Sequence, residues 1–251
     1  MKRVFRFFLC VVSIASLCTG TPSLSAQRTI EKTIAVDGFE RSYLLYIPGK
    51  NHAADKPVVM MLHGRGGSSQ SAASDFGWME KADQEDFIVV FPQALPVDPA
   101  RSSGATLPNN LIQHWTFPTN DSVWWTHTIA ANYPYLANPE YPRITHPLDA
   151  PFLAAVLLDV LKNYGGDARR VYVVGFSSGG EMASDFAQSA STEVAAVAIV
   201  GSVGLDRPRQ LTHPLSAFLA IGTDDLSTQN AWNSMPAIAR EKWYGKRVCP
   251  R

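Results

Sequence analysis

The chain has little cysteine, no run of charge of either sign and no apolar stretch long enough to span a bilayer. Two of its three cysteines, Cys10 and Cys18, lie near the start, so only Cys249 remains in the body of the chain. That leaves two interpretations, a free exposed thiol or a cysteine whose partner lay further along the chain. The 22 basic and 22 acidic residues are dispersed, which argues against a nucleic-acid partner. No pattern predicts a metal or cofactor, and we expect neither.

The first residues have the pattern of a secretory signal. A basic start between Lys2 and Arg6 precedes an apolar stretch at 7–17, and small residues follow at 23–26. The apolar stretch is shorter than the about 20 residues that a membrane-spanning helix needs. We therefore expect residues 1–26 to be cleaved, the protein to be secreted into the periplasm or medium, and no membrane contact to remain.

The remainder, residues 27–251, is long enough for one large domain with a substantial core. Apolar runs typical of buried strands alternate with helical patterns, and a hairpin across Asp37-Gly38 precedes them. We expect an α/β-hydrolase fold, a mostly parallel sheet with helices on both faces and without its last strand. The expected strands are 33–36, 41–48, 57–62, 87–91, 170–176, 194–200 and 216–222, and helical patterns cover 72–86, 151–164 and 181–187.

Residues 93–147 contain many prolines, asparagines and aromatics and no clear periodicity. A structureless segment of that length is uncommon in a compact domain unless it covers a site or packs locally. We predict a cap beside the active cleft; the alternative is an insertion whose aromatics pack on the body. The aromatics concerned are Trp115, Trp124, Trp125, Tyr133, Tyr135 and Tyr141.

The most informative motif is Gly175-Phe176-Ser177-Ser178-Gly179, which follows a β-branched run and precedes a helical pattern. In a nucleophile elbow, a strand turns sharply into a helix and glycines on either side let neighbouring backbone pass. The context predicts such an elbow, with Ser177 as nucleophile. The alternative is a glycine-rich turn whose serine caps the helix.

Acyl transfer also requires donors aimed at the developing oxyanion. In an α/β-hydrolase these are the N–H of the residue after the serine and one from the loop after the third strand. Here they correspond to the backbone N–H groups of Ser178 and Arg65, the latter in the loop from His63 to Gly67. We expect the His63 side chain to be structural.

The acid is expected after the strand that follows the elbow unit, and the run from Leu219 to Asp225 ends in two carboxylates. We predict that Asp225, rather than Asp224, orients the base. The alternative is that both aspartates cap a helix beginning near Thr228.

The histidine expected in this chain order, after the acid, is lacking. His213 precedes the acid-bearing strand and should lie at its far end, whereas three others fall in the aromatic segment and could approach the cleft. The six histidines are His52, His63, His114, His127, His146 and His213.

With these motifs, the chain resembles the secreted esterases that include polyhydroxybutyrate depolymerases, feruloyl esterases and acetyl xylan esterases. The resemblance implies cleavage of carboxylic esters through an acyl-enzyme, with a small-molecule or polymeric ester as substrate. It rests on 36–43, 62–64, 87–93, 175–180 and 222–225.

Departures from this family concern the histidine and the segment 117–147, which is longer than the usual connection. In the family a tryptophan and a cysteine follow the acid, and Trp243 with Cys249 resembles that pair. The catalytic histidine comes later, so the resemblance implies that the C-terminal segment carrying it, and the last strand, are missing. Without the base we expect weak activity, about 10³- to 10⁴-fold over water.

Two other functions remain open from the sequence. A prolyl-oligopeptidase-like secreted peptidase would use the same elbow and acid. A catalytically weak domain could instead bind polymer through Trp124 and Trp125.

Overall fold

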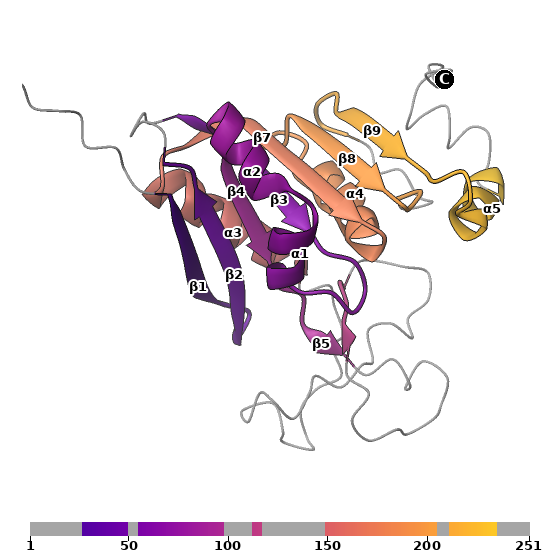
Figure 1. Ribbon diagram of the computed structural model, residues 1–251, viewed down its shortest axis with the longest axis horizontal. Helices are drawn as coiled ribbons and strands as arrows, with labels where there is room; N and C mark the ends of the chain where they lie inside the picture. The colour runs from indigo at the N-terminus through magenta and orange to yellow at the C-terminus, as the bar shows by residue number, and fades with distance from the viewer. Residues whose placement is uncertain (1–26, 50–54, 98–111, 117–148, 205–210, 235–251) are drawn as a thin grey trace, which may run out of the picture.

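The computed structural model describes residues 27–49, 55–97, 112–116, 149–204 and 211–234. In this part of the chain seven strands form one sheet, in the order β1-β2-β4-β3-β7-β8-β9 (Figure 1). The strands are β1 (Arg28–Val36), β2 (Phe39–Ile47), β3 (Lys56–Leu62), β4 (Ile88–Pro92), β7 (Gly166–Phe176), β8 (Ala196–Val200) and β9 (Ser216–Ala220).

Strands β4, β3, β7, β8 and β9 are parallel, whereas β1 and β2 are antiparallel additions at one edge. β4 follows β3 in the chain but lies between β2 and β3 in the sheet. The helical segment between β3 and β4 carries the chain back to the β2 side of β3. This is the α/β-hydrolase fold, as the sequence predicts. The carboxyl ends of the parallel strands meet at one edge of the sheet, where such folds place their sites.

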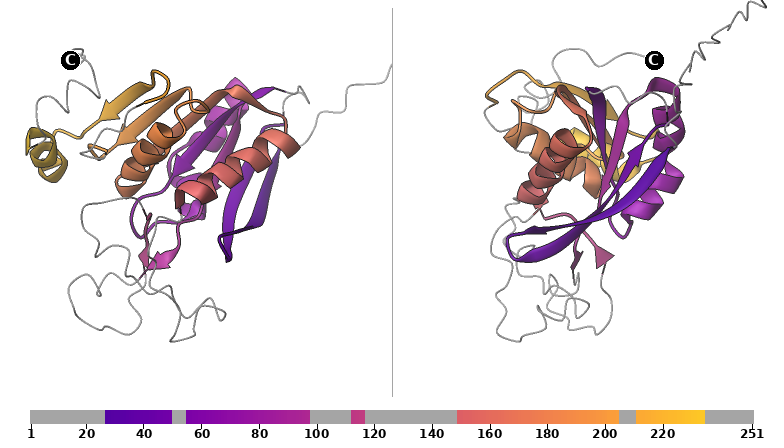
Figure 2. Two further views of the ribbon diagram at one scale, coloured as in Figure 1. Left: turned by 180° about the vertical axis from the view of Figure 1, so that it is seen from behind. Right: turned by 90° about the vertical axis from the view of Figure 1, so that its left-hand side faces the viewer.

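Helices cover both faces of the sheet. Figure 1 shows α1 and α2 in front of it, and the view from behind in Figure 2 shows α3 and α4. Each face has its own apolar cluster, one around Phe91 with α1 and α2, the other around Phe152 and Phe186 with α3 and α4. The helices are α1 (Ser69–Asp75), α2 (Trp78–Glu85), α3 (Asp149–Asn163) and α4 (Ser178–Ser189), and α5 (Leu226–Ser234) follows β9.

Because both faces of the sheet are covered, the parallel strands have continuous apolar runs. In β4 all five residues are buried, because alternate side chains enter the two clusters. The hairpin is confirmed: Val36 pairs with Phe39, and Asp37 and Gly38 both have positive φ, at 51° and 81°.

The helical pattern over 72–86 divides into two helices rather than one. Helix α1 ends at Asp75 and α2 begins after Gly77, whose φ of 68° turns the chain. Ser68 caps α1 by accepting the Ser71 N–H, a local signal that lies ahead of the expected start.

Within the proline- and aromatic-rich segment, the described residues form a two-stranded ribbon. β5 (Pro96–Val97) pairs with β6 (Ile112–Gln113), and Trp115 just beyond β6 is 2% exposed in the body. This one aromatic packs on the body; the predicted cap otherwise lies outside the described residues, as do the predicted signal at 1–26 and Cys249. Among the helices described, none is long and apolar enough to cross a membrane.

Candidate active site

Ser177 has the strained backbone of a nucleophile elbow. It lies between the end of β7 and the first residue of α4, with φ 54° and ψ −122°. A residue other than glycine held there costs on the order of 1–3 kcal/mol, which surrounding contacts must offset. One such contact is the hydrogen bond from Ser177 N–H to Val200 O, 2.8 Å long. The alternative of a serine that caps the helix does not hold, because Ser177 makes no side-chain cap hydrogen bond.

The flanking glycines are required by close backbone approach. A Cβ on Gly175 would lie 2.0 Å from Gly179 O. On Gly179 it would lie 2.4 Å from the carbonyl oxygens of both Leu62 and His63. The start of α4 therefore packs directly against β7 and against the end of β3, and no side chain fits between them.

The loop from His63 to Gly67 lies beside the elbow. A Cβ built on Gly64 would be 3.5 Å from Ser177 Cβ and 3.2 Å from a ring carbon of Phe176. The structure thus brings together two motifs that lie far apart in the sequence, at 63–67 and 175–179. Whatever group reacts at Ser177 lies within reach of this loop.

Two backbone N–H groups remain available here. In the loop, Gly66 N–H donates to Gln113 O (2.9 Å) and Gly67 N–H to Gly64 O (3.0 Å), whereas Arg65 N–H has no hydrogen-bond acceptor among the described residues. Ser178 is the first residue of α4, so its N–H has no partner within the helix. A helix N-terminus also favours negative charge. The sequence predicts these two groups as oxyanion donors, and that role stays a prediction.

His63 is a structural residue, as the sequence predicts. The side chain is buried; Nε2 accepts the Ala94 N–H at 3.1 Å, and Nδ1 lies 2.8 Å from Gly64 O. Nδ1 therefore carries the proton in this arrangement. Burial lowers the pKa of His63, which keeps the ring neutral. A ring engaged on both nitrogens is not placed to take the proton of Ser177.

Asp225 lies beyond the carboxyl end of β9, at the same edge of the sheet as Ser177. Gly201, which follows β8, donates to Ala220 O (2.9 Å) and accepts the Thr228 hydroxyl at 3.4 Å. Asp225 Oδ1 accepts the Thr228 N–H at 3.0 Å, and its hydrogen bonds with Thr228 lower its pKa. In this structure Asp225 thus makes the hydrogen bond of a helix cap. That it orients the catalytic base stays a prediction.

The other histidines do not complete a triad within the described residues. His114 is buried, with Nδ1 2.8 Å from Trp115 O. His213 precedes β9, which begins beside Ala196, so it lies at the opposite edge from the elbow, as expected. His52, His127 and His146 are outside the described residues.

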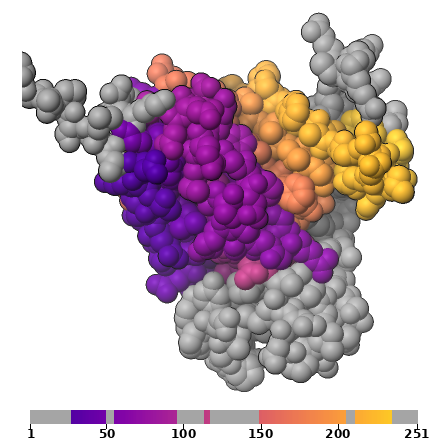
Figure 3. Space-filling view, in the orientation of Figure 1, coloured from indigo at the N-terminus to yellow at the C-terminus, as the bar shows by residue number. Residues whose placement is uncertain are grey.

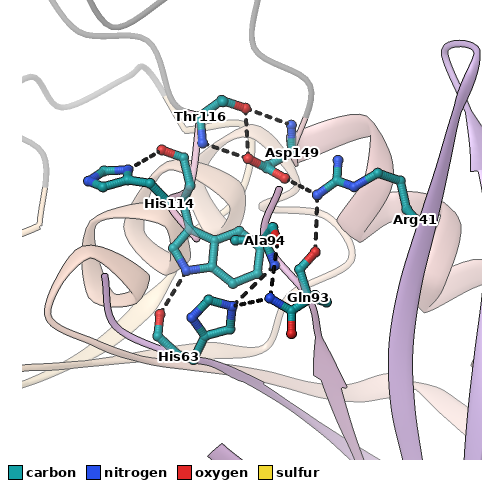
Figure 4. A network of polar contacts seen from close by, with 8 residues as sticks. Arg41, His63, Gln93, Ala94, His114, Thr116 and Asp149 are labelled. Atoms are coloured by element: carbon teal, nitrogen blue, oxygen red, sulfur yellow. Dashed lines mark hydrogen bonds and ion pairs between the residues drawn. The ribbon is translucent and has the colours of Figure 1, made fainter. Parts of the chain in front are cut away.

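Sequence reasoning missed Glu181 and a buried network. Glu181 is in the first turn of α4, one turn from Ser177, and burial raises its pKa to about 7. The network joins Arg41 to Asp149, residues 108 positions apart (Figure 4). Helical periodicity does not signal either feature, because both arise from tertiary packing.

The described residues contain no group of three or more His, Cys, Asp or Glu side chains that could hold a metal ion.

Comparison with known proteins gives relatives of one kind. The chain is 26% identical over 207 residues to feruloyl esterase B of Thermothelomyces thermophilus, covering 81% of this chain and 59% of that protein. It is 23% identical over 198 residues to a bifunctional acetylxylan esterase/xylanase of Neocallimastix patriciarum, covering 79% and 23%. These curated relatives are esterases. The chain spans less than two thirds of the length of either one, and no family model matches it.

Solved structures show similar arrangements. An acetyl xylan esterase from Aspergillus awamori has a TM-score of 0.46 and 17% identity, covering 70% of this chain and 51% of that chain. An S-formylglutathione hydrolase from Agrobacterium tumefaciens has a TM-score of 0.49 and 14% identity, covering 87% and 68%.

Proposed function

We propose that this protein is a serine hydrolase of carboxylic esters, with Ser177 as nucleophile. The observation that carries the proposal is the strained Ser177 backbone, held between glycines that admit no side chain and beside a loop with a spare donor. Similarity to two esterases supports ester hydrolysis as the reaction. Backbone strain of this kind, where side-chain packing gives no reason for it, is typical of functional sites.

In the proposed reaction, Ser177 Oγ attacks the ester carbonyl and its proton passes to a base. The N–H groups of Arg65 and Ser178 stabilise the oxyanion, and Asp225 orients the base. The alcohol then leaves, and water hydrolyses the acyl-enzyme. One oxyanion donor typically contributes about 3 kcal/mol of transition-state stabilisation.

None of the three described histidines is placed as that base. Alanine replacement of His52, His127 and His146, one at a time, tests whether the chain supplies it. Loss of activity in a single variant that remains folded would identify the residue. No loss in any of them would mean that Ser177 works without a histidine from this chain.

For substrates, we propose acetyl or feruloyl esters of plant polysaccharide, with polyhydroxybutyrate-type polyester as a further candidate, acted on after secretion. Two aromatic rings beside the elbow support a partly apolar substrate. Phe176 and Phe76 are each 40% exposed, and their ring centroids are 5.6 Å apart. Apolar contact of this kind suits an acyl group more than a charged peptide.

The proposal is tested with Ser177→Ala and with Ser189→Ala as a matched control. Ser189 ends the same helix, and among the described residues its hydroxyl bonds only Phe186 O. On p-nitrophenyl acetate, methyl ferulate and acetylated xylan, Ser177→Ala should fall to the uncatalysed background and Ser189→Ala should retain its rate. Equal rates for the two variants would refute the role of Ser177.

A further inference from the structure

The predicted oxyanion loop is held from outside at two points that flank Arg65. On one side Trp115 donates its indole N–H to His63 O at 2.7 Å, and on the other Gln113 O accepts the Gly66 N–H at 2.9 Å. Both contacts come from residues 112–116, a short segment that runs along the loop. The Trp115 ring also packs on His63, with centroids 4.9 Å apart.

Segment 112–116 is itself held by one buried carboxylate. Asp149 Oδ2 accepts both the backbone N–H of Thr116 (2.5 Å) and its hydroxyl (2.7 Å), while Asp149 N–H lies 3.2 Å from the same hydroxyl. Asp149 begins α3, so the segment is fixed to a helix that packs on the core.

Arg41 of β2 neutralises that carboxylate. Its guanidinium forms an ion pair with Asp149, and the exposed fractions of the two side chains are 1% and 0%. Nη2 also donates to Gln93 O at 3.2 Å, and the guanidinium stacks over the Phe152 ring at 4.0 Å. A buried pair of this kind contributes little net stability compared with apolar residues, so its presence here fits a role in placing other groups.

We propose that Arg41, Asp149, Thr116 and Trp115 form a strut that positions the Arg65 N–H for the oxyanion. Figure 4 shows Arg41, Asp149 and Thr116 joined in series. Trp115, the residue before Thr116 in the chain, continues the path to the loop through its bond to His63 O. These are positioning residues that touch no substrate. The inference rests on the proposed function, because a positioned donor matters only if Ser177 reacts.

The strut is tested first without reference to activity. Trp115→Phe keeps an aromatic ring, removes the donor to His63 O and shortens the buried side chain. Trp78→Phe is the matched control, since Trp78 in α2 packs on Phe87 away from the loop. Amide hydrogen exchange over residues 63–67 should be about tenfold faster in Trp115→Phe and unchanged in Trp78→Phe. Unchanged exchange in Trp115→Phe would overturn the strut.

Reactivity is tested by the second-order rate of Ser177 labelling with a fluorophosphonate, whose phosphoryl oxygen occupies the oxyanion position. At a temperature where all variants are folded, Trp115→Phe should react at least about tenfold more slowly than the unaltered protein and Trp78→Phe at its rate. With an ester substrate, kcat should fall while KM stays within about twofold.

Thr116→Val and Thr116→Ser distinguish positioning from general stability. Valine keeps the shape but loses the hydroxyl bond to Asp149, whereas serine keeps that bond. Slow labelling in Thr116→Val, restored in Thr116→Ser, is expected; equal rates in both would overturn the role of the strut. If the unaltered protein is not labelled at all, the proposed function itself fails, whatever the exchange data show.

Discussion

Burial raises the pKa of Glu181 to about 7, and this makes the stability of the fold depend on pH near neutrality. The unfolded value is near 4.5, so both states are protonated below that pH. As the pH rises from 4.5 to about 7, the carboxyl ionises in the unfolded chain while it stays protonated in the folded protein, so stability is lost over that interval and is constant above it. Glu181→Gln removes this ionisation and keeps the shape of the side chain.

We therefore expect Glu181→Gln to be the more stable protein at pH 8, by on the order of 3 kcal/mol, and to differ little at pH 4.5. Urea unfolding of both proteins at several pH values measures this. A difference that does not grow with pH would show that Glu181 is solvated in the folded protein.

At the scale of elements, the unit of β7, the elbow and α4 depends on its flanking glycines, of which Gly175 has the shortest contact. A methyl group on Gly175 would lie 2.0 Å from Gly179 O, which is backbone and cannot move aside cheaply. Gly175→Ala should cost more than about 4 kcal/mol of unfolding free energy, or prevent folding.

Gly222→Ala is the control for that prediction. Its added Cβ would meet only an ordinary contact, 3.6 Å from Asp225 Cβ. Urea unfolding should show a small change in Gly222→Ala. If Gly175→Ala is tolerated equally well, the strand and helix are not packed as described.

An element can be predicted from the sequence when residues close together in the chain determine it. The elbow, β3 and β4 could be predicted because their apolar runs and glycines act between near neighbours. The break at Gly77 was missed, since a helical composition continues across a glycine whose positive φ is visible only in the structure.

The buried pair Arg41 and Asp149 was missed for the opposite reason. Each looks like an ordinary surface charge in sequence, and the hydrogen bonds of Asp149 form only when α3 and segment 112–116 meet. Asp225 was placed correctly at the carboxyl edge, but a turn carboxylate that caps α5 and one that orients a base share one sequence pattern.

At the scale of the molecule, β9 leaves an apolar edge and face. Among the described residues it pairs only with β8, and its sequence carries no charge. In Figure 3, α1 and α2 cover the neighbouring part of this face, while β8 and β9 remain visible beside them. A shallow hollow of about 230 Å³ lies there, lined by residues of β7, β8 and β9 that include Tyr172, Ala198 and Phe218.

An uncharged edge strand next to an exposed apolar face promotes self-association. Phe218 is 63% exposed on this face, so Phe218→Lys should raise the concentration at which association begins. Leu158→Lys is the control, because Leu158 is 65% exposed but lies on α3. Light scattering against concentration compares them, and an equal effect of both would show that total charge, rather than the edge, governs association.

The proposed function requires the strained serine of the elbow to be an activated nucleophile. Peptide mapping by mass spectrometry after incubation with a fluorophosphonate tests it most directly. We predict one adduct, on Ser177, in the unaltered protein and none in Ser177→Ala. An unlabelled Ser177 in the folded protein, or an adduct that persists in Ser177→Ala, would contradict the claim.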